Sequence, residues 1–145
     1  MLSVPPLQPA VEAIANFYGL RGRTPIGTLS GLYSLHPTCD LPVPMRWPAQ
    51  YPNCDATGLY LVYNELAQLL YVGKANRIGH RLGNYFGEDQ DPTVCVILSS
   101  EWSSRPGYVA TIVTADETEA LELERHLIRE LDPPDNKQHR RLCRE

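Results

Sequence analysis

Two apolar runs separated by a short polar stretch set the strongest constraint on how this chain folds. The runs are GLYLVY at residues 58–63 and LLYVGK at residues 69–74, and the turn residues Asn64 and Glu65 follow the first run. Short runs rich in β-branched and aromatic residues, bounded by turn residues, are typical of paired strands. The sequence therefore predicts an antiparallel hairpin.

The predicted hairpin carries more polar groups than packing requires. Tyr60 and Tyr71 lie on its two arms, and Gly73 indicates a place where the backbone turns or comes close to another group. Lys74 follows at once, and Arg81 comes seven residues later. Val and Ile would satisfy the packing of a strand, so two phenols and two cations in so short a stretch indicate a candidate site.

Hydrophobic periodicity predicts the other elements. Helices are expected at 9–18, 77–86 and 117–131, and strands at 94–98 and 108–113. Asp116 and Glu119 resemble a capping box at the start of the last helix. That helix must end near Leu131, because the Pro133-Pro134 pair follows and the residue before a proline disfavours helical backbone.

Proline density separates the N-terminal part of the chain from the rest. Nine of the thirteen prolines lie in residues 1–57, and proline interrupts both helices and sheets, so we expect irregular structure from about residue 20 to residue 57. A length of 145 residues predicts one domain. We interpret residues 1–57 as a proline-rich N-terminal extension packed on the core, and residues 58–145 as the domain itself.

A carboxylate interrupts the apolar stripe of the last helix. Apolar residues recur there at helical spacing, and position 124, in the middle of the stripe, is Glu. Glu124 either reaches solvent at the edge of the stripe, or pairs with a core arginine, or is a ligand for a hard divalent cation. Glu117, Glu119 and Glu122 are expected to form a solvated face that suits the positive end of the helix dipole.

The charge of the chain is unevenly distributed. The net charge is −4, whereas a sequence-independent DNA binder is usually basic, because phosphate contacts supply most of its affinity. Residues 71–86 nevertheless hold Lys74, Arg77 and Arg81 without any acid, and residues 116–124 hold five acids without any cation. A basic patch beside an acidic helix is compatible with a local site.

Cysteine usage and hydropathy indicate the compartment. The four cysteines are scattered without a C-x-x-C pair, which predicts reduced thiols rather than a zinc site or a disulfide framework. No run of 18 apolar residues occurs, and the first residues lack the pattern of a secretory signal. We therefore expect a cytoplasmic protein with no membrane partner.

Each candidate residue also has a purely structural explanation when it is taken alone. Tyrosine is common in strands, exposed lysine and arginine are usually solvated, and Asn136 fits a turn after two prolines. His80 is by default a surface histidine, although it lies on the basic helix and could contact phosphate. A second Gly-x-Tyr, GLY at residues 31–33, has no Tyr-x-Gly at hairpin distance and is set aside.

Taken together, residues 58–136 resemble a GIY-YIG nuclease domain. The sequence GLY at residues 58–60 stands for the first half of the motif and YVG at residues 71–73 for the second, and ALELERHLI resembles the later helix of the nuclease module in the bacterial excision-repair incision subunit. The resemblance implies an α/β (α+β) fold, in which a small central antiparallel sheet is flanked by helices. It assigns a catalytic role to six residues: Tyr60, Tyr71, Lys74, Arg81, Glu124 and Asn136.

The resemblance also implies a chemistry. Glu124 would hold Mg²⁺ or Mn²⁺, a cation that needs only one or two protein carboxylates. Lys74, Arg77, His80 and Arg81 would bind substrate phosphate. Tyr60 would be the general base, with its phenolate favoured by the neighbouring cations, and Asn136 would fix the geometry of the site. The partner would be DNA, reached with the help of residues 1–57, a targeting protein or a homodimer.

Two departures from the family pattern leave the choice of substrate open. The stretch between Arg81 and Glu124 is longer than in the repair enzymes, and residues 1–57 have no counterpart there. The first hypothesis is a metal-dependent endonuclease that cuts DNA by water attack. The alternatives are a catalytically inactive module on the same fold, which binds nucleic acid or protein, and an enzyme that acts on RNA.

Overall fold

The computed structural model describes residues 5–35, 45–46, 53, 55–88, 95–97 and 102–136. A short 3-10 helix, Pro5–Leu7, leads into the first α-helix. The helices are α1 (Gln8–Arg21), α2 (Ile78–Leu82) and α3 (Glu117–Leu131). The strands are β1 (Tyr33–Ser34), β2 (Met45–Arg46), β3 (Gly58–Asn64), β4 (Leu69–Ala75), β5 (Phe86–Glu88), β6 (Cys95–Ile97) and β7 (Pro106–Val113).

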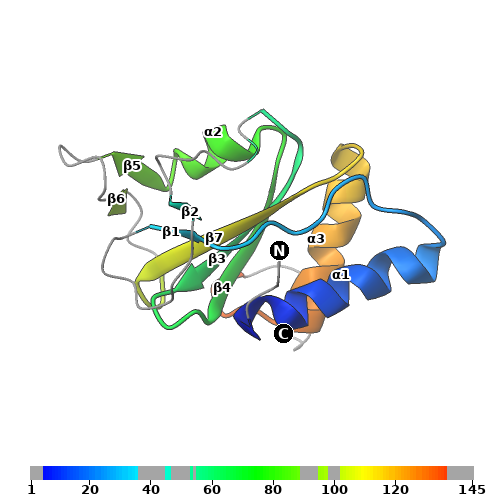
Figure 1. The fold of residues 1–145 in the computed structure, drawn as a ribbon, viewed down its shortest axis with the longest axis horizontal. Coiled ribbons are helices and arrows are strands. Elements are labelled where there is room, and N and C mark those ends of the chain that lie inside the picture. Colours follow the sequence, from blue (N-terminus) through cyan, green and yellow to red (C-terminus); the bar gives the residue numbers. More distant parts are fainter. Residues whose placement is uncertain are drawn as a thin grey trace, which may run out of the picture.

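The main sheet has five strands in the order β2-β1-β7-β3-β4 (Figure 1). The pairs β3–β4, β3–β7 and β1–β7 are antiparallel, which confirms the predicted small antiparallel sheet flanked by helices. The edge strand β2 runs parallel to β1, a pairing that the sequence did not indicate. Strands β5 and β6 form a separate antiparallel pair.

The central strand β3 carries the first half of the motif and is buried over its whole length. It has β4 on one side and β7 on the other, so apolar residues point to both faces of the sheet. A side chain at Gly58 would collide with the backbone of Ile112 on β7. Glycine is therefore required there by the close approach of two strands.

The sheet separates two apolar layers. Leu59, Leu61 and Tyr63 of β3 face a core completed by α1 and α3, which lie side by side (Figure 1). The alternate residues Tyr60 and Val62 face a second core completed by α2 and Phe86, the first residue of β5. This alternation is what a strand with both faces covered requires. It places the first tyrosine of the motif on the side of α2.

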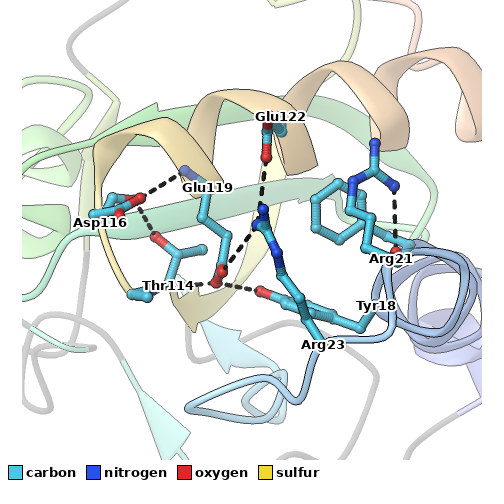
Figure 2. Close-up of polar contacts among 9 residues, drawn as sticks. Tyr18, Arg21, Arg23, Thr114, Asp116, Glu119 and Glu122 are labelled. Atoms are coloured by element: carbon cyan, nitrogen blue, oxygen red, sulfur yellow. Dashed lines mark hydrogen bonds and ion pairs between the residues drawn. The ribbon is translucent and has the colours of Figure 1, made fainter.

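The N-terminal helix α1 contributes directly to the first core. Its residues Ile14, Phe17 and Tyr18 are buried together with residues of β3 and α3. A polar network also joins the two helices (Figure 2): the Tyr18 hydroxyl donates to Oε2 of Glu119 at 2.8 Å, and Arg23 lies 3.7 Å from Oε1 of the same carboxylate and 3.5 Å from Glu122. The division of the chain at residue 57 stays a prediction.

Several predicted boundaries differ from those in the structure. The helix expected at 77–86 is wrong in its second half: α2 ends at Leu82, and Phe86 already belongs to β5. The three-residue turn from Tyr85 N–H to the Leu82 carbonyl, at 3.0 Å, tightens the chain after Gly83 and ends the helix. The irregular stretch expected from residue 20 to residue 57 contains β1 and β2.

Other predictions agree more closely with the structure. Helix α3 has the predicted bounds, and its capping residue Asp116 accepts a hydrogen bond from the Glu119 N–H at 2.8 Å. Strand β6 lies inside the predicted run at 94–98, and β7 begins at Pro106, two residues before the predicted start. In the part of the chain that the structure describes, no helix is long and apolar enough to cross a membrane.

Candidate functional site

The two motif tyrosines come together over Gly73. The rings of Tyr60 and Tyr71 lie 6.1 Å apart, and Gly73 is the cross-strand neighbour of Tyr60. A side chain at Gly73 would collide with both rings. The predicted role of this glycine, a close approach to another group, is therefore confirmed, and the group is the phenol of Tyr60.

A register shift beside Val62 sets the direction of the second tyrosine. Val62 pairs with Tyr71 but the next residue, Tyr63, pairs with Leu69, so Leu70 is an extra residue in β4. Both Leu70 and Tyr71 then pack on the core that contains Tyr60. Bulges of this kind bend a strand and redirect a side chain.

Tyr60 is almost fully buried and is held by polar partners. Only 1% of its surface is exposed. Its hydroxyl shares a hydrogen bond of 3.1 Å with the hydroxyl of Tyr85 and accepts a longer one, 3.5 Å, from Nε of Arg81. The guanidinium of Arg81 also lies 5.7 Å from the centre of the Tyr85 ring. Arg81 is thus tied to Tyr60 as the sequence predicts, and Tyr85 completes the arrangement.

The phenols are harder to ionise than expected. Burial raises the pKa of Tyr60 far above its ordinary value, the hydrogen bond between the Tyr60 and Tyr85 hydroxyls raises it further, and Arg81 only partly opposes them. Burial, followed by Tyr85 and the charge of Glu124, raises the pKa of Tyr71 to about 12. Arg81 therefore favours the phenolate, as expected, but in the protein by itself desolvation outweighs it and the pKa of each phenol stays raised.

The predicted phosphate-binding residues line one open pocket of about 540 Å³. Lys74 near the end of β4, Arg77 just before α2, and His80 and Arg81 in the last turn of α2 are all exposed around it. His80 Nε2 lies 3.3 Å from Oδ1 of Asp55. The structure brings the four residues together, as predicted, on a surface able to accept an anion.

Glu124 lies at the side of the buried face of α3. The buried residues of that helix include Ala120, Leu123 and Leu127, whereas Glu124 is only partly buried. Glu124 therefore lies off the centre of the stripe rather than in its middle, although Ala120 and Ile128, about one turn before and after it, are buried. The charge of Glu124 contributes to the raised pKa of Tyr71, and α3 packs against β4, the strand that carries Tyr71.

The glutamate that is buried in α3 is Glu119. It was expected on a solvated face, but its side chain accepts hydrogen bonds from the Tyr18 hydroxyl at 2.8 Å and the Ala115 N–H at 3.2 Å, and only 7% of the residue is exposed. A buried carboxylate needs such partners. Helix α1 supplies one of them, and the sequence of α3 alone does not show it.

Asn136 is buried against the outer edge of β4. Its Oδ1 accepts a hydrogen bond from the Val72 N–H at 2.8 Å, and its Nδ2 donates to the Val72 carbonyl at 2.9 Å. The Asp135 N–H donates to the Leu70 carbonyl at 2.9 Å, so this segment provides backbone partners for β4, which lies at the edge of the sheet formed by the described strands. Asn136 thus acts on the backbone between the second tyrosine and Gly73.

Comparison with known proteins gives this geometry its context. A family model described as the UvrC-like GIY-YIG domain matches residues 56–137, more than half of the chain. This chain belongs to the GIY-YIG family. The match contains all six residues to which the motif resemblance assigned a catalytic role.

Curated relatives agree with the family match. UvrABC system protein C of Pseudomonas fluorescens (strain Pf-5) is 41% identical over 80 residues, which are 54% of this chain and 12% of that protein. The proteins of the same name from Ectopseudomonas mendocina and Pseudomonas aeruginosa are 42% and 41% identical over 80 residues, with the same coverage. This GIY-YIG chain therefore spans only about one eighth of the length of these relatives.

The donor set of this GIY-YIG site suits a weakly held hard cation. Among the described residues no group of three or more His, Cys, Asp or Glu side chains could enclose a metal ion. Glu124 offers one carboxylate near the tyrosines, and Mg²⁺ commonly takes the rest of its ligands from water and substrate phosphate. The residues present are compatible with such an ion.

Two aromatic residues of the site were missed by the sequence reasoning. Tyr85 belongs to the stretch that resembles the family, but the sequence reasoning gave it no role in the site, although it comes four residues after Arg81. Side chains at this spacing come together when a helical turn continues. Trp102 lies beside Tyr85, with ring centres 5.5 Å apart. It follows an interval that has no recognisable motif, so no sequence signal pointed to it.

A second hollow lies apart from these residues. It has a volume of about 660 Å³ and is lined by one side of α1, by Pro25 and by residues 27–31, and Tyr18 and Arg23 lie at its wall. Every lining residue precedes the region that matches the GIY-YIG family. The hollow contains none of the predicted site residues.

Proposed function

We propose that this chain is a metal-dependent endonuclease that hydrolyses DNA phosphodiester bonds by attack of water. The observation that carries the proposal is the position of Arg81. Its guanidinium lines the basic pocket and also donates to Tyr60, so one side chain connects the surface suited to phosphate with the motif tyrosines. A planar guanidinium can contact two phosphate oxygens at once.

The neighbouring cations would neutralise the charge that develops on phosphorus. Lys74, Arg77 and His80 surround the same pocket and would hold the phosphates on either side of the bond. Lysine provides a compact point charge, whereas Arg81 fixes orientation. Cations fixed in place before the substrate arrives need little rearrangement during the reaction.

The tyrosines would position the attacking water. Tyr71 is the more accessible of the two, its ring contacts that of Tyr60, and the charge of Glu124 contributes to its raised pKa. With raised pKa values, the phenols act in the resting protein as protonated hydrogen-bond groups. A role of Tyr60 as general base then requires substrate or cation to favour the phenolate when the complex forms.

Mg²⁺ or Mn²⁺ bound at Glu124 would supply Lewis-acid polarisation of the phosphate. Glu124 is the described carboxylate whose charge reaches Tyr71, so it is the residue that we propose as the metal ligand. Asn136 is a positioning residue in this proposal, because it contacts the backbone of Val72 rather than the reacting groups.

Nicking of supercoiled plasmid tests the proposal. The wild-type chain with Mg²⁺ or Mn²⁺ should nick the DNA, and chelation should stop it. Glu124→Gln and Arg81→Lys should lower the rate by at least about 100-fold, as is typical when a group that stabilises transition-state charge is removed. Arg105→Lys is the matched control, because Arg105 is an exposed arginine that pairs with Glu65 away from the pocket.

The same assay decides between the alternatives. Binding to DNA without cleavage under either metal would favour a catalytically inactive binding module, a role compatible with the burial of Tyr60. Labelled RNA and DNA tested in parallel would reveal an RNA substrate. Because the net charge is −4, we also expect weak DNA binding by the chain alone, and targeting by a partner protein or by a homodimer.

A further inference from the structure

Three partly exposed aromatic rings meet beside the basic pocket. The ring centres of Tyr71 and Trp102 lie 5.9 Å apart, those of Tyr85 and Trp102 lie 5.5 Å apart, and those of Tyr71 and Tyr85 lie 6.5 Å apart. These are the separations of aromatic rings in contact. Each of the three residues keeps part of its surface exposed. We call these three rings the aromatic surface.

Packing against buried Phe86 holds the aromatic surface in place. Phe86 is buried and stacks under Trp102, with the ring planes inclined by only 17° and the centres 6.1 Å apart. Tyr71 and Tyr85 contact the same indole at steep angles of 86° and 65°. The indole is therefore fixed before any ligand arrives, which limits the entropy lost on binding.

Core packing alone does not explain a tryptophan at position 102. Its indole nitrogen is buried and has no acceptor among the residues that the structure describes. A buried donor without a partner is unfavourable, and phenylalanine would rest on Phe86 without that penalty. Tryptophan provides a larger flat π-surface, which is an advantage when a flat ligand stacks on it.

Arg81 connects the aromatic surface to the phosphate pocket. Its guanidinium lies 5.7 Å from the centre of the Tyr85 ring, and the same side chain lines the pocket with Lys74 and Arg77. Aromatic rings next to a line of cations are the combination by which proteins bind single-stranded nucleic acid: the cations follow the backbone and the rings stack on bases.

We propose that the aromatic surface of Tyr71, Tyr85 and Trp102 stacks an unpaired nucleobase of a DNA strand whose phosphate lies in the basic pocket. In an intact duplex both faces of each base are covered by neighbouring bases, so only an unpaired or extruded base can stack there. The inference rests on the proposed function, and it narrows the substrate class to DNA with unpaired nucleotides next to the cleaved bond.

Binding of single strands in the absence of divalent cation tests the proposal without cleavage. Trp47→Phe leaves Trp102 as the single tryptophan of the chain. In that background, an oligothymidylate of about eight nucleotides should bind about 10-fold more tightly than an abasic strand of equal length, and should quench the emission of Trp102. The two probes carry the same phosphates, so the difference reports on the bases alone.

Substitutions of Trp102 assign the effect to the aromatic surface. Trp102→Leu should bring the ratio of the two affinities close to one, and Trp102→Phe should leave an intermediate ratio. Equal affinity of the parent protein for the two strands, or an unchanged ratio in a folded Trp102→Leu protein, would overturn the proposal. If Trp102→Leu does not fold, the ratio and the quenching in the parent protein decide the question.

Cleavage separates this proposal from the nuclease proposal. A preference for base-bearing strands without cleavage of any DNA would contradict the nuclease function and leave the base-stacking site standing. A different result would contradict the base-stacking site and leave the nuclease function standing. That result is equal cleavage of a perfect duplex and of a duplex with two unpaired nucleotides, together with equal binding of the two single strands.

Discussion

The carboxamide of Asn136 pairs with both backbone groups of Val72, at 2.8 Å and 2.9 Å. Val72 lies on β4, the last strand of the sheet, between Tyr71 and Gly73. An asparagine that follows α3 in the chain thus takes the place of a neighbouring strand. The segment that presents the second tyrosine is held from both sides, by β3 and by Asn136.

Replacement of Asn136 by alanine should lower both stability and cleavage. The Val72 N–H and carbonyl would lose their partner in a buried position, and we expect the free energy of unfolding to fall by about 1–3 kcal/mol in urea titrations. Asp135→Asn is the control, because its carboxylate accepts from the Ser103 N–H at an exposed place and does not contact Val72. Equal losses in the two variants would show that the pairing with Val72 contributes nothing specific.

Gly73→Ala should displace the ring of Tyr60. The added methyl group would overlap the Tyr60 phenol and the ring of Tyr71, so we expect destabilisation of about 1–3 kcal/mol, typical of an overpacked core, together with a loss of cleavage. Gly19→Ala is the control: Gly19 lies within α1, nothing surrounds its missing Cβ, and alanine should stabilise the helix by about 0.5–1 kcal/mol. Full activity in Gly73→Ala would contradict the close packing of the tyrosines.

Stability should fall at alkaline pH, in part through Tyr18. Burial, and then the hydrogen bond to Glu119, raise the pKa of Tyr18 above its ordinary value. Above about pH 10 the unfolded chain therefore loses this proton before the folded chain does, and stability decreases as pH rises, by at most about 1.4 kcal/mol per pH unit for one group. Below about pH 10 Tyr18 is protonated in both the folded and the unfolded chain, so its full contribution to the free energy of unfolding is present.

Tyr18→Phe removes one titrating group and should make the alkaline decline less steep. Tyr60 and Tyr63 also have raised pKa values, so part of the decline should remain. Urea unfolding at several pH values between about 9 and 11 measures the slope. An identical slope in Tyr18→Phe and wild type would contradict the assignment.

Much of the fold was predictable because its patterns are local. The hairpin, α3 and β7 are each specified by their own periodicity and boundary residues, and the structure places them within about two residues of the prediction. The pairing of β1 with β7 and of β2 with β1 joins segments far apart in sequence. Strands of two residues have no periodicity to recognise, so these pairings could not be predicted.

In the candidate site, too, the residues could be predicted from local sequence patterns, whereas their burial could not. Motif spacing was sufficient to select Lys74 and Arg81, which the structure places around one pocket. The degree of burial was not predictable. Tyr60 is almost fully covered, so desolvation dominates its pKa, and this depends on Tyr85 and on packing against α2 that no short pattern encodes.

The glutamates of α3 give the last prediction, because the sequence places Glu117 and Glu119 on the same solvated face and the structure separates them. Glu117 and Glu119 both lie in the first turn, yet Glu117 is exposed and Glu119 is buried against Tyr18 and Arg23 (Figure 2). Glu119→Ala would leave the buried Tyr18 hydroxyl and the Ala115 N–H without their acceptor. We expect the free energy of unfolding to fall by about 2–3 kcal/mol.

Glu117→Ala is the matched variant, with the same change of charge at the same end of the same helix. Its exposed carboxylate accepts from the exposed Asn76 amide at 3.2 Å and otherwise contributes through the helix dipole, so the loss should be about 0.3–1 kcal/mol and should shrink at high salt. The loss in Glu119→Ala should persist at high salt, because buried partners are little screened. Equal, salt-sensitive losses in the two variants would mean that Glu119 acts as a surface charge and that α1 is not anchored to α3 through it.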